Sequence, residues 1–276
     1  RHAVGIPRHG ADGGVEEAAI HIGDRVAQEA LEERLRLGRL LTERGSADDA
    51  LKVFQKSLAL DDRDPILHYE VGLLYADHLN DAAAAEQHLL KARGLDPTHR
   101  EVMERLVGLQ LSLDKAHEAI PTLAELIRLD PSTATLRNTL IDDYRRRTDE
   151  QPDDMQSKFA LGMLYRISGQ IEDAIVLFQD TRKAHELFLH SCNMLGQCFW
   201  ERRAAGPASA ATEEAAVKWF KRGIEAKGYP EEDYLELRYN LAEVYSHRNE
   251  AAEALKLYQD IYAVDVHYKD VAEKMR

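Results

Sequence analysis

The chain has 276 residues, of which 44% are hydrophobic and 31% are charged, and its formal net charge is −13. The apolar content is ample for a core, whereas the negative charge argues against nucleic acid or an anionic membrane as the main partner, because both require Lys and Arg to neutralise phosphate. No apolar run approaches the roughly 20 residues that span a bilayer. We therefore expect protein or peptide partners, favouring those with a basic segment, and neither nucleic acid binding nor direct membrane insertion within this segment.

Residues 1–30 precede the regular pattern of the chain. Residues 1–14 are rich in glycine and show no periodicity, which is typical of a tail or linker. From Val15 onward, Ala18, Ala19, Ile22 and Val26 continue one face of a helix. We predict an N-terminal tail followed by a capping helix on the first regular unit. Because the chain begins with Arg1 and not with methionine, we also expect it to be part of a longer protein.

A pattern of three residues then recurs with a period close to 34 residues. A small residue is followed by an alanine, usually twelve or thirteen positions later, and a large apolar residue comes four positions after the alanine. Units of this period cannot bury their apolar face alone and must stack on one another. The six sets are Gly38, Ala50 and Phe54; Gly72, Ala85 and Leu89; Val107, Ala119 and Leu123; Gly162, Ala174 and Phe178; Gly196, Ala216 and Phe220; and Ala242, Ala254 and Tyr258.

The fourth set shows why each unit should be a helical hairpin. Leu161, Gly162 and Tyr165 share one face of a first helix, since residues three and four apart lie above one another. Gly169 can take the positive φ that ends this helix. Ala174 and Phe178 then lie on the inward face of a second helix. We expect the small residue to let the two helices approach closely, with the large residue filling the space beside it.

These motifs resemble the tetratricopeptide repeat family. The resemblance rests on Leu161-Gly162-x-x-Tyr165, on Ala174-x-x-x-Phe178 and on the closing Asp96-Pro97 and Asp130-Pro131. It covers roughly residues 31–264 and recurs six times. It implies an all-α fold, a tetratricopeptide-repeat solenoid of helical hairpins, that binds partners rather than catalysing a reaction.

The middle of the chain departs from the regular pattern. After Pro131 the sequence predicts one helix at 134–149, carrying Leu136, Leu140 and Ile141, and no second helix before Pro152. We therefore predict a first array at 31–152 and a second array at 153–276, each with three repeats and a closing helix, at 134–149 and at 267–276. A degenerate repeat with a short second helix is the alternative. Residues 204–212, rich in small side chains, should form a loop inside the fifth repeat.

No motif in the sequence predicts catalysis. Glycine-rich phosphate loops, Gly-x-Ser-x-Gly and Cys-x-x-Cys are absent. His185 and His190 are five residues apart, which places them on different sides of a helix, so with Cys192 they offer only a weak alternative metal cluster. Cys192 and Cys198 are too poorly aligned on one helix to pair. We expect no catalytic residue, no metal and no cofactor.

Two free thiols favour a reducing compartment, so we predict a cytoplasmic location. A periplasmic or membrane-tethered protein, anchored through a flank outside this sequence, is the alternative.

The family resemblance also implies a partner-binding groove lined by the first helices of successive hairpins. Aromatic, methionine and amide side chains suit a peptide-binding surface. Trp200 packed beneath the 204–212 loop and Tyr69 packed as inter-repeat core are the structural alternatives. The groove residues implied by the resemblance are Tyr69, Leu73, Asp77, Phe159, Met163, Arg166, Asn193, Met194, Gln197, Trp200, Tyr239, Asn240 and Glu243.

The leading functional hypothesis is therefore a non-catalytic protein–protein interaction scaffold, adaptor or assembly factor. Two alternatives stay open. The segment could be the sensor or substrate-recruiting arm of a larger enzyme, or it could be a structural scaffold that assembles with copies of itself.

Overall fold

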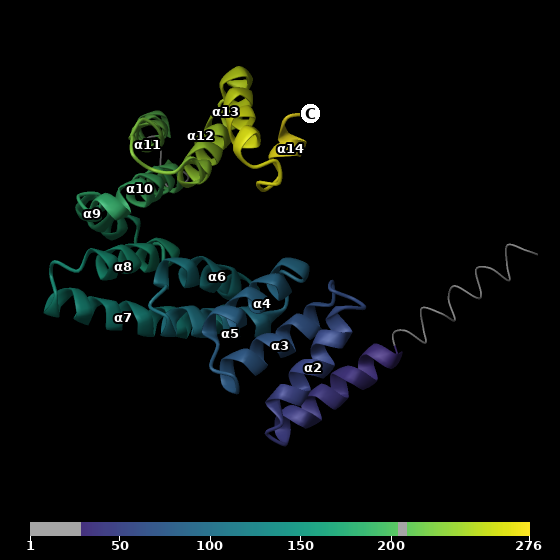
Figure 1. The fold of residues 1–276 in the computed structure, drawn as a ribbon. Coiled ribbons are helices and arrows are strands. Elements are labelled where there is room, and N and C mark those ends of the chain that lie inside the picture. The colour runs from purple at the N-terminus through teal and green to yellow at the C-terminus, as the bar shows by residue number, and fades with distance from the viewer. Residues whose placement is uncertain (1–28, 204–208) are drawn as a thin grey trace, which may run out of the picture. The chain divides into compact units, whose positions relative to one another are not determined.

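In the computed structural model, the described residues are 29–203 and 209–276, and they form helices joined by short turns, with no strand among them (Figure 1). The predicted all-α fold of helical hairpins is confirmed. Contacts between Cα atoms separate the chain into two compact units, which we call unit 1 (Arg1–Lys115) and unit 2 (Ala116–Arg276). None of the helices in the described ranges is both long enough and apolar enough to cross a membrane.

In unit 1, successive helices pack against one another. A helix at residues 29–43 packs on α2 through Gly38 and Phe54. α2 then packs on α3, α3 on α4 and α4 on α5. The labelled helices are α2 (Ala47–Leu58), α3 (Pro65–Asp77), α4 (Ala82–Leu95) and α5 (Arg100–Ser112).

Unit 2 contains three consecutive hairpins, α8 with α9, α10 with α11 and α12 with α13, and each hairpin packs on the next. α6 and α7 both pack on α8, and the short α14 packs on α13. The helices are α6 (Ala116–Leu129), α7 (Ala134–Glu150), α8 (Met155–Ile167), α9 (Ile171–Thr181), α10 (Phe188–Arg202), α11 (Ser209–Ile224), α12 (Leu235–His247), α13 (Ala251–Val264) and α14 (Val271–Lys274).

The small residue of the repeat pattern allows the two helices of a hairpin to touch. A Cβ atom added to Gly162 would lie 2.8 Å from the Phe178 ring, and one added to Gly196 would lie 2.3 Å from the Phe220 ring. Both distances are shorter than a non-bonded carbon contact allows. The six alanines and six large residues of the pattern are all buried. The predicted packing of small against large side chains is therefore confirmed.

Aspartate side chains set where several helices begin. Asp64 Oδ1 accepts hydrogen bonds from two backbone amides at the start of α3, and Asp154 Oδ1 accepts one, 3.0 Å long, from Ser157 N at the start of α8. Such caps satisfy amides that have no partner inside the helix. At the other end of α8, Gly169 takes the predicted positive φ, 83°. α4 and α6 end just before Asp96 and Asp130, each followed by proline, as predicted.

The helix predicted at 134–149 is present as α7, but its packing differs from the prediction. Leu136 is 39% exposed and Leu140 is only half-buried, while Ile141 and Tyr144 form its buried side. α7 packs on α8, so the segments on the two sides of Pro152 contact each other. The division between the two compact units falls after Lys115 rather than after residue 152, and the two-array division at 31–152 and 153–276 stays a prediction.

Three further predictions concern segments at the edges of the repeats. The loop predicted at 204–212 is wrong at its end, because α11 already begins at Ser209; residues 204–208 lie outside the described residues. The closing helix predicted at 267–276 is shorter, since α14 covers only Val271–Lys274 and is preceded by turns. The predicted N-terminal tail, and most of its capping helix, also lie outside the described residues.

Both cysteines belong to the core of unit 2 and should be unreactive. Cys192 and Cys198 are free and fully buried. Burial raises the pKa of the Cys192 thiol to about 11 and that of Cys198 to about 12, and only the thiolate is an effective nucleophile. We expect no reaction with Ellman's reagent at pH 8 in the folded protein, and two reacting thiols after denaturation. Rapid modification of either thiol in the folded protein would contradict this burial.

Candidate functional site

The first helices of unit 2 carry ten of the thirteen predicted groove residues, but those on α8 do not form an open surface. Phe159 and Met163 are 3% and 4% exposed, and the Phe159 ring lies 5.3 Å from the Phe178 ring and 6.3 Å from the His190 ring. Phe159 and Met163 are therefore buried in this structure, and their place in a partner-binding groove stays a prediction. The physical reason is that α8 is enclosed by α6, α7 and α9.

Arg166, the third predicted residue on α8, is engaged by its neighbour. Its guanidinium forms an ion pair with Glu201 at the end of α10, and only about a fifth of its side chain is exposed. This contact joins α8 to α10, so Arg166 lies beside the surface formed by the next two first helices.

We call the surface formed by α10 and α12 the α10–α12 face and define it by Asn193, Met194, Gln197, Trp200, Tyr239, Asn240 and Glu243. Asn240 Nδ2 donates a 2.8 Å hydrogen bond to Asn193 Oδ1 and so connects the two helices. Asn193 is buried, whereas Met194 and Gln197 are half-buried. The structure thus brings three side-chain amides and one methionine together on adjacent helices.

Trp200 lies at one end of this face within a polar cluster. The Arg203 guanidinium lies 3.8 Å from the Trp200 ring centroid, and the His247 ring meets Trp200 edge-on at 5.2 Å. Arg203 also pairs with Glu213, with N and O atoms 3.5 Å apart. These contacts, which involve Glu213 on α11 and His247 on α12, fix the orientation of the Trp200 ring.

On α12, Tyr239 and Glu243 contact the C-terminal segment, which we define as residues 265–276. Tyr239 OH donates a 2.7 Å hydrogen bond to Asp270 Oδ1. Glu243 Oε1 accepts a 2.8 Å hydrogen bond from Lys274 Nζ and another from the Tyr258 hydroxyl. Burial, followed by these carboxylate partners, raises the pKa values of Tyr239 and Tyr258.

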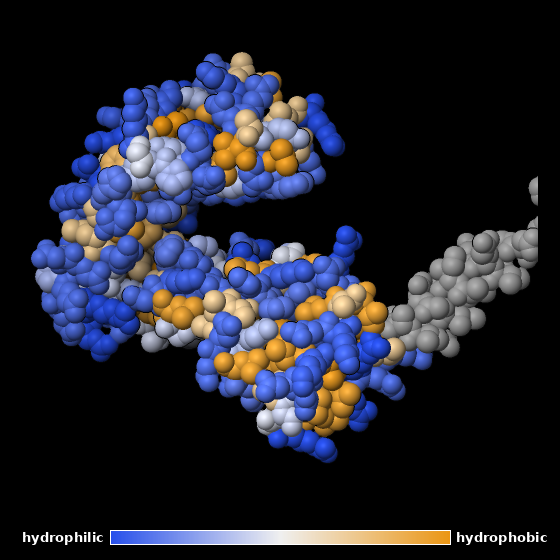
Figure 2. Space-filling model, viewed as in Figure 1, coloured by the Kyte–Doolittle hydropathy of each residue, from blue (hydrophilic) through white to orange (hydrophobic). Residues whose placement is uncertain are grey.

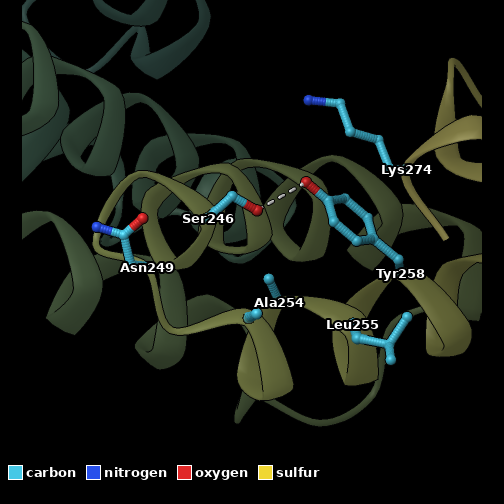
Figure 3. A pocket seen from close by; sticks show the side chains of 7 residues that line it. Ser246, Asn249, Ala254, Leu255, Tyr258 and Lys274 are labelled. Atoms are coloured by element: carbon cyan, nitrogen blue, oxygen red, sulfur yellow. Dashed lines mark hydrogen bonds between the residues drawn. The ribbon is translucent and has the colours of Figure 1, made fainter. Parts of the chain in front are cut away.

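A pocket of about 260 Å³ opens at the turn from α12 to α13, beside Lys274 of the C-terminal segment (Figure 3). Ala254 and Leu255 form its apolar part, and the Tyr258 hydroxyl points toward Ser246 Oγ, 3.4 Å away. Lys274 extends past the Tyr258 ring from the C-terminal segment. The pocket therefore lies where α14 stops short of covering the start of α13.

The three predicted groove residues in unit 1 lie on α3. Tyr69 and Leu73 are half-buried, and the Tyr69 ring lies 5.6 Å from the His99 ring. Asp77 is exposed and forms an ion pair with Arg105 of α5. α3 thus presents one aromatic, one aliphatic and one ion-paired side chain, which is a smaller polar set than that on the α10–α12 face.

The basic triplet Arg145–Arg147 at the end of α7 is paired with nearby groups. Arg145 Nε donates a 2.7 Å hydrogen bond to Tyr165 OH, and Arg146 and Arg147 both form ion pairs with Asp143. A pocket of about 330 Å³ lies alongside, between α7 and the turn from α8 to α9. The triplet thus belongs to a charge-balanced helix end.

The weak metal cluster considered for residues 185–192 does not form. His185 stacks on Tyr229 with ring centroids 4.7 Å apart, His190 faces Phe159, and Cys192 lies in the core. In the part of the chain that the structure describes, no three His, Cys, Asp or Glu side chains gather as a metal site.

The surface in view is largely hydrophilic, with apolar side chains in separate patches (Figure 2).

Sequence reasoning missed a pair of histidines in unit 1, of which one is buried and the other half-buried. His68 is 3% exposed, and its Nδ1 lies 2.9 Å from His88 Nδ1. Neither histidine stands out in the sequence as a core residue. Residues 68 and 88 belong to the two helices of one hairpin, which is the only signal that could have brought them together.

The family comparison agrees with this architecture. Residues 35–100, roughly a quarter of the chain, match the family model described as Tetratricopeptide repeat. This match shows that residues 35–100 contain tetratricopeptide repeats. None of the curated proteins matches the chain.

Several solved structures are similar in their helical arrangement. The structure of Pseudomonas aeruginosa pilF is 15% identical in sequence. The match covers 90% of this chain and 97% of the pilF chain, with a TM-score of 0.34. PilW, described as a type IV pilus biogenesis factor, is 14% identical over 90% and 99%, with a TM-score of 0.35. A tetratricopeptide repeat protein from Parabacteroides merdae is 10% identical over 95% and 93%, with a TM-score of 0.39. At these identities and scores, none of them says what this chain binds.

Proposed function

We propose that the chain is a non-catalytic scaffold that binds a protein segment on the α10–α12 face. The observation that carries this proposal is the Asn240–Asn193 hydrogen bond between adjacent first helices, with Met194 and Gln197 half-buried beside it. Amide groups can pair with the backbone of an extended segment, and methionine adapts to varied apolar side chains. The proposed binding surface therefore comprises only α10 and α12 of the helices in the predicted groove.

The net charge and the lack of a catalytic motif support a binding role. With a net charge of −13, the chain attracts basic segments over distances within the Debye length. The repeated hairpins supply a rigid surface without needing a large cavity. Binding of a short segment on such a face is expected to be moderate in affinity and weaker at high salt.

The proposal predicts that changing the face removes partner capture without unfolding the chain. Met194→Glu and Gln197→Arg together should reduce recovery of the bound protein from native extract at least tenfold, because both changes alter size and charge at half-buried positions. The measurement is quantitative mass spectrometry of proteins retained by the full chain.

Val176→Glu is the matched control, since Val176 is 64% exposed on α9, a second helix. We expect this control to retain the same partner as the unmodified chain. Loss of capture in the Val176 variant, or full capture by the Met194/Gln197 variant, would contradict binding on the α10–α12 face. Circular dichroism confirms that each variant remains helical.

A further inference from the structure

The C-terminal segment lies against α12 through side chains and not only through its short helix. Val271 is fully buried and anchors α14. Ahead of it, Tyr268 OH and Lys269 Nζ both donate to Glu236 Oε2, at 2.6 Å and 2.7 Å. Lys274 Nζ donates to Glu243 Oε1, which lies seven residues, or about two turns, beyond Glu236 on α12. Two carboxylates of one helix thus bind two lysines of one short segment.

Aromatic rings complete the contact around Lys269. Its ammonium lies 4.3 Å from the Tyr239 ring centroid and 5.3 Å from the Tyr268 ring centroid, both within range of a cation–π attraction. Burial alone would raise the pKa of Glu236, but the hydrogen bonds from Lys269 and Tyr268 outweigh it and lower that pKa. The Lys269 ammonium therefore lies against one carboxylate and two aromatic rings.

The backbone of Lys269 is in a conformation that lysine rarely adopts. Its φ is 45°, in the left-handed region that favours glycine. A residue in this region persists only when its surroundings hold it there. Here the side-chain contacts with Glu236 and Tyr239 supply that constraint, which suggests that the lysine side chain, and not the turn alone, determines how the segment docks.

From this geometry we propose that Glu236, Tyr239 and Glu243 form a recognition site for a segment that carries a lysine beside an aromatic residue, and that residues 265–276 occupy this site as an internal ligand. The inference rests on the proposed function, because the site includes two residues of the α10–α12 face, and it specifies the chemistry of the partner. A basic aromatic partner segment would reach the full face by displacing the C-terminal segment.

Tethering explains why displacement would be regulated. A segment that directly follows α13 competes at an effective concentration that is commonly in the millimolar range. To displace the tethered segment, a partner must make added contacts, at Gln197 and Met194, or be present at a higher local concentration. The C-terminal segment would thus raise the threshold for binding weak basic segments.

The test uses a fluorescent, N-acetylated peptide with the sequence of residues 265–276 and measures its binding to the full chain by fluorescence anisotropy. Lys269→Ala with Lys274→Ala should loosen the internal segment while leaving α12 and the Val271 anchor unchanged, because both lysine contacts are lost and alanine does not relieve the left-handed turn. We expect the peptide to bind this loosened variant at least tenfold more tightly than the unmodified chain. Adding Glu236→Gln to the loosened variant should weaken peptide binding at least tenfold.

Two controls separate recognition from general charge attraction. Glu253→Gln makes the same chemical change at an exposed position of α13 and should leave peptide binding unchanged. A peptide with glutamate in place of both lysines should not bind the loosened variant.

Equal peptide binding to the loosened and unmodified chains would overturn the inference, as would insensitivity to Glu236→Gln. Hydrogen exchange provides a second readout: if the loosened variant loses protection throughout α12 and α13 and binds no peptide, the segment is a structural cap only. Either failure leaves the capture experiment with the Met194 and Gln197 variant unaffected, so the proposed function and this inference can fail separately.

Discussion

Replacing Phe220 with alanine should lower the free energy of unfolding of unit 2 by about 3–5 kcal/mol, the usual cost of removing a buried aromatic ring. Phe220 is 1% exposed and fills the space left by the missing side chain of Gly196. Neighbouring side chains cannot collapse fully into the cavity, because Gly196, which faces the Phe220 ring, has no side chain to fill it. The two tryptophans of the chain, Trp200 and Trp219, both lie in unit 2, so tryptophan fluorescence during urea unfolding reports on this unit.

Adding a side chain at Gly196, opposite the Phe220 ring, is a complementary test of this packing. Gly196→Ala should destabilise unit 2 by about 1–3 kcal/mol, because its new Cβ atom would overlap the Phe220 ring. In the double variant Gly196→Ala with Phe220→Leu, the smaller side chain makes room, so the combined cost should be less than the sum of the two single costs. Strictly additive costs would contradict direct packing between residues 196 and 220.

Lowering the pH from 7 to 4 should destabilise unit 1 through the His68–His88 pair. Burial is the main cause that lowers the pKa of both histidines, to about 4 for His88 against an ordinary value of 6.5, and neighbouring His68 and Lys91 add to the shift of His88. As the pH falls, His88 therefore binds a proton near pH 6.5 in the unfolded chain but only near pH 4 in the folded chain. Stability is full above pH 6.5 and is lost as the pH falls toward 4.

The hydrogen bonds of the pair identify its neutral form. His68 Nε2 lies 3.0 Å from the Asp62 carbonyl oxygen, which can only accept, so His68 carries its proton on Nε2. His68 Nδ1 must then accept a hydrogen bond from His88 Nδ1, while the Tyr75 ring stacks on His88. Asp62 and Asp64 favour the charged form of His68, but burial outweighs them.

The expected loss of stability on acidification follows from the lowered pKa of His88. A full change from 6.5 to about 4 corresponds to about 3 kcal/mol. Because His88 is only half-buried, solvent screening reduces this, and we expect about 1–2 kcal/mol. Urea unfolding of His88→Gln, followed by circular dichroism at both pH values, should show a pH dependence smaller by that amount. An NMR titration midpoint for His88 near 6.5 would contradict the buried neutral pair.

Much of the fold could be predicted because the repeat encodes local packing. Gly162 and Phe178 touch within one hairpin, so their spacing in sequence determines their contact in space. The same holds for Asp154, whose carboxylate caps the helix that begins at the next residue. Such contacts depend on residues that are near in sequence.

The exposure of individual site residues could not be predicted in the same way. Phe159 and Met163 have the composition of a binding surface, but α6 and α7 both pack on α8, and the sequence pattern of α8 carries no information on those neighbours. The contacts of Tyr239 and Glu243 with residues 265–276 likewise depend on a turn with Lys269 in a left-handed conformation. Periodicity cannot predict such a turn for lysine.

The most direct test of the account is hydrogen exchange of the full chain alone and in complex with the protein recovered in the capture experiment. We predict slower exchange in α10 and α12 on binding, centred on Gln197 and Asn240, together with faster exchange in residues 265–276 as the C-terminal segment is displaced. Protection confined to the second helices α9, α11 and α13, with α10 and α12 unchanged, would contradict a partner-binding surface on the first helices of unit 2.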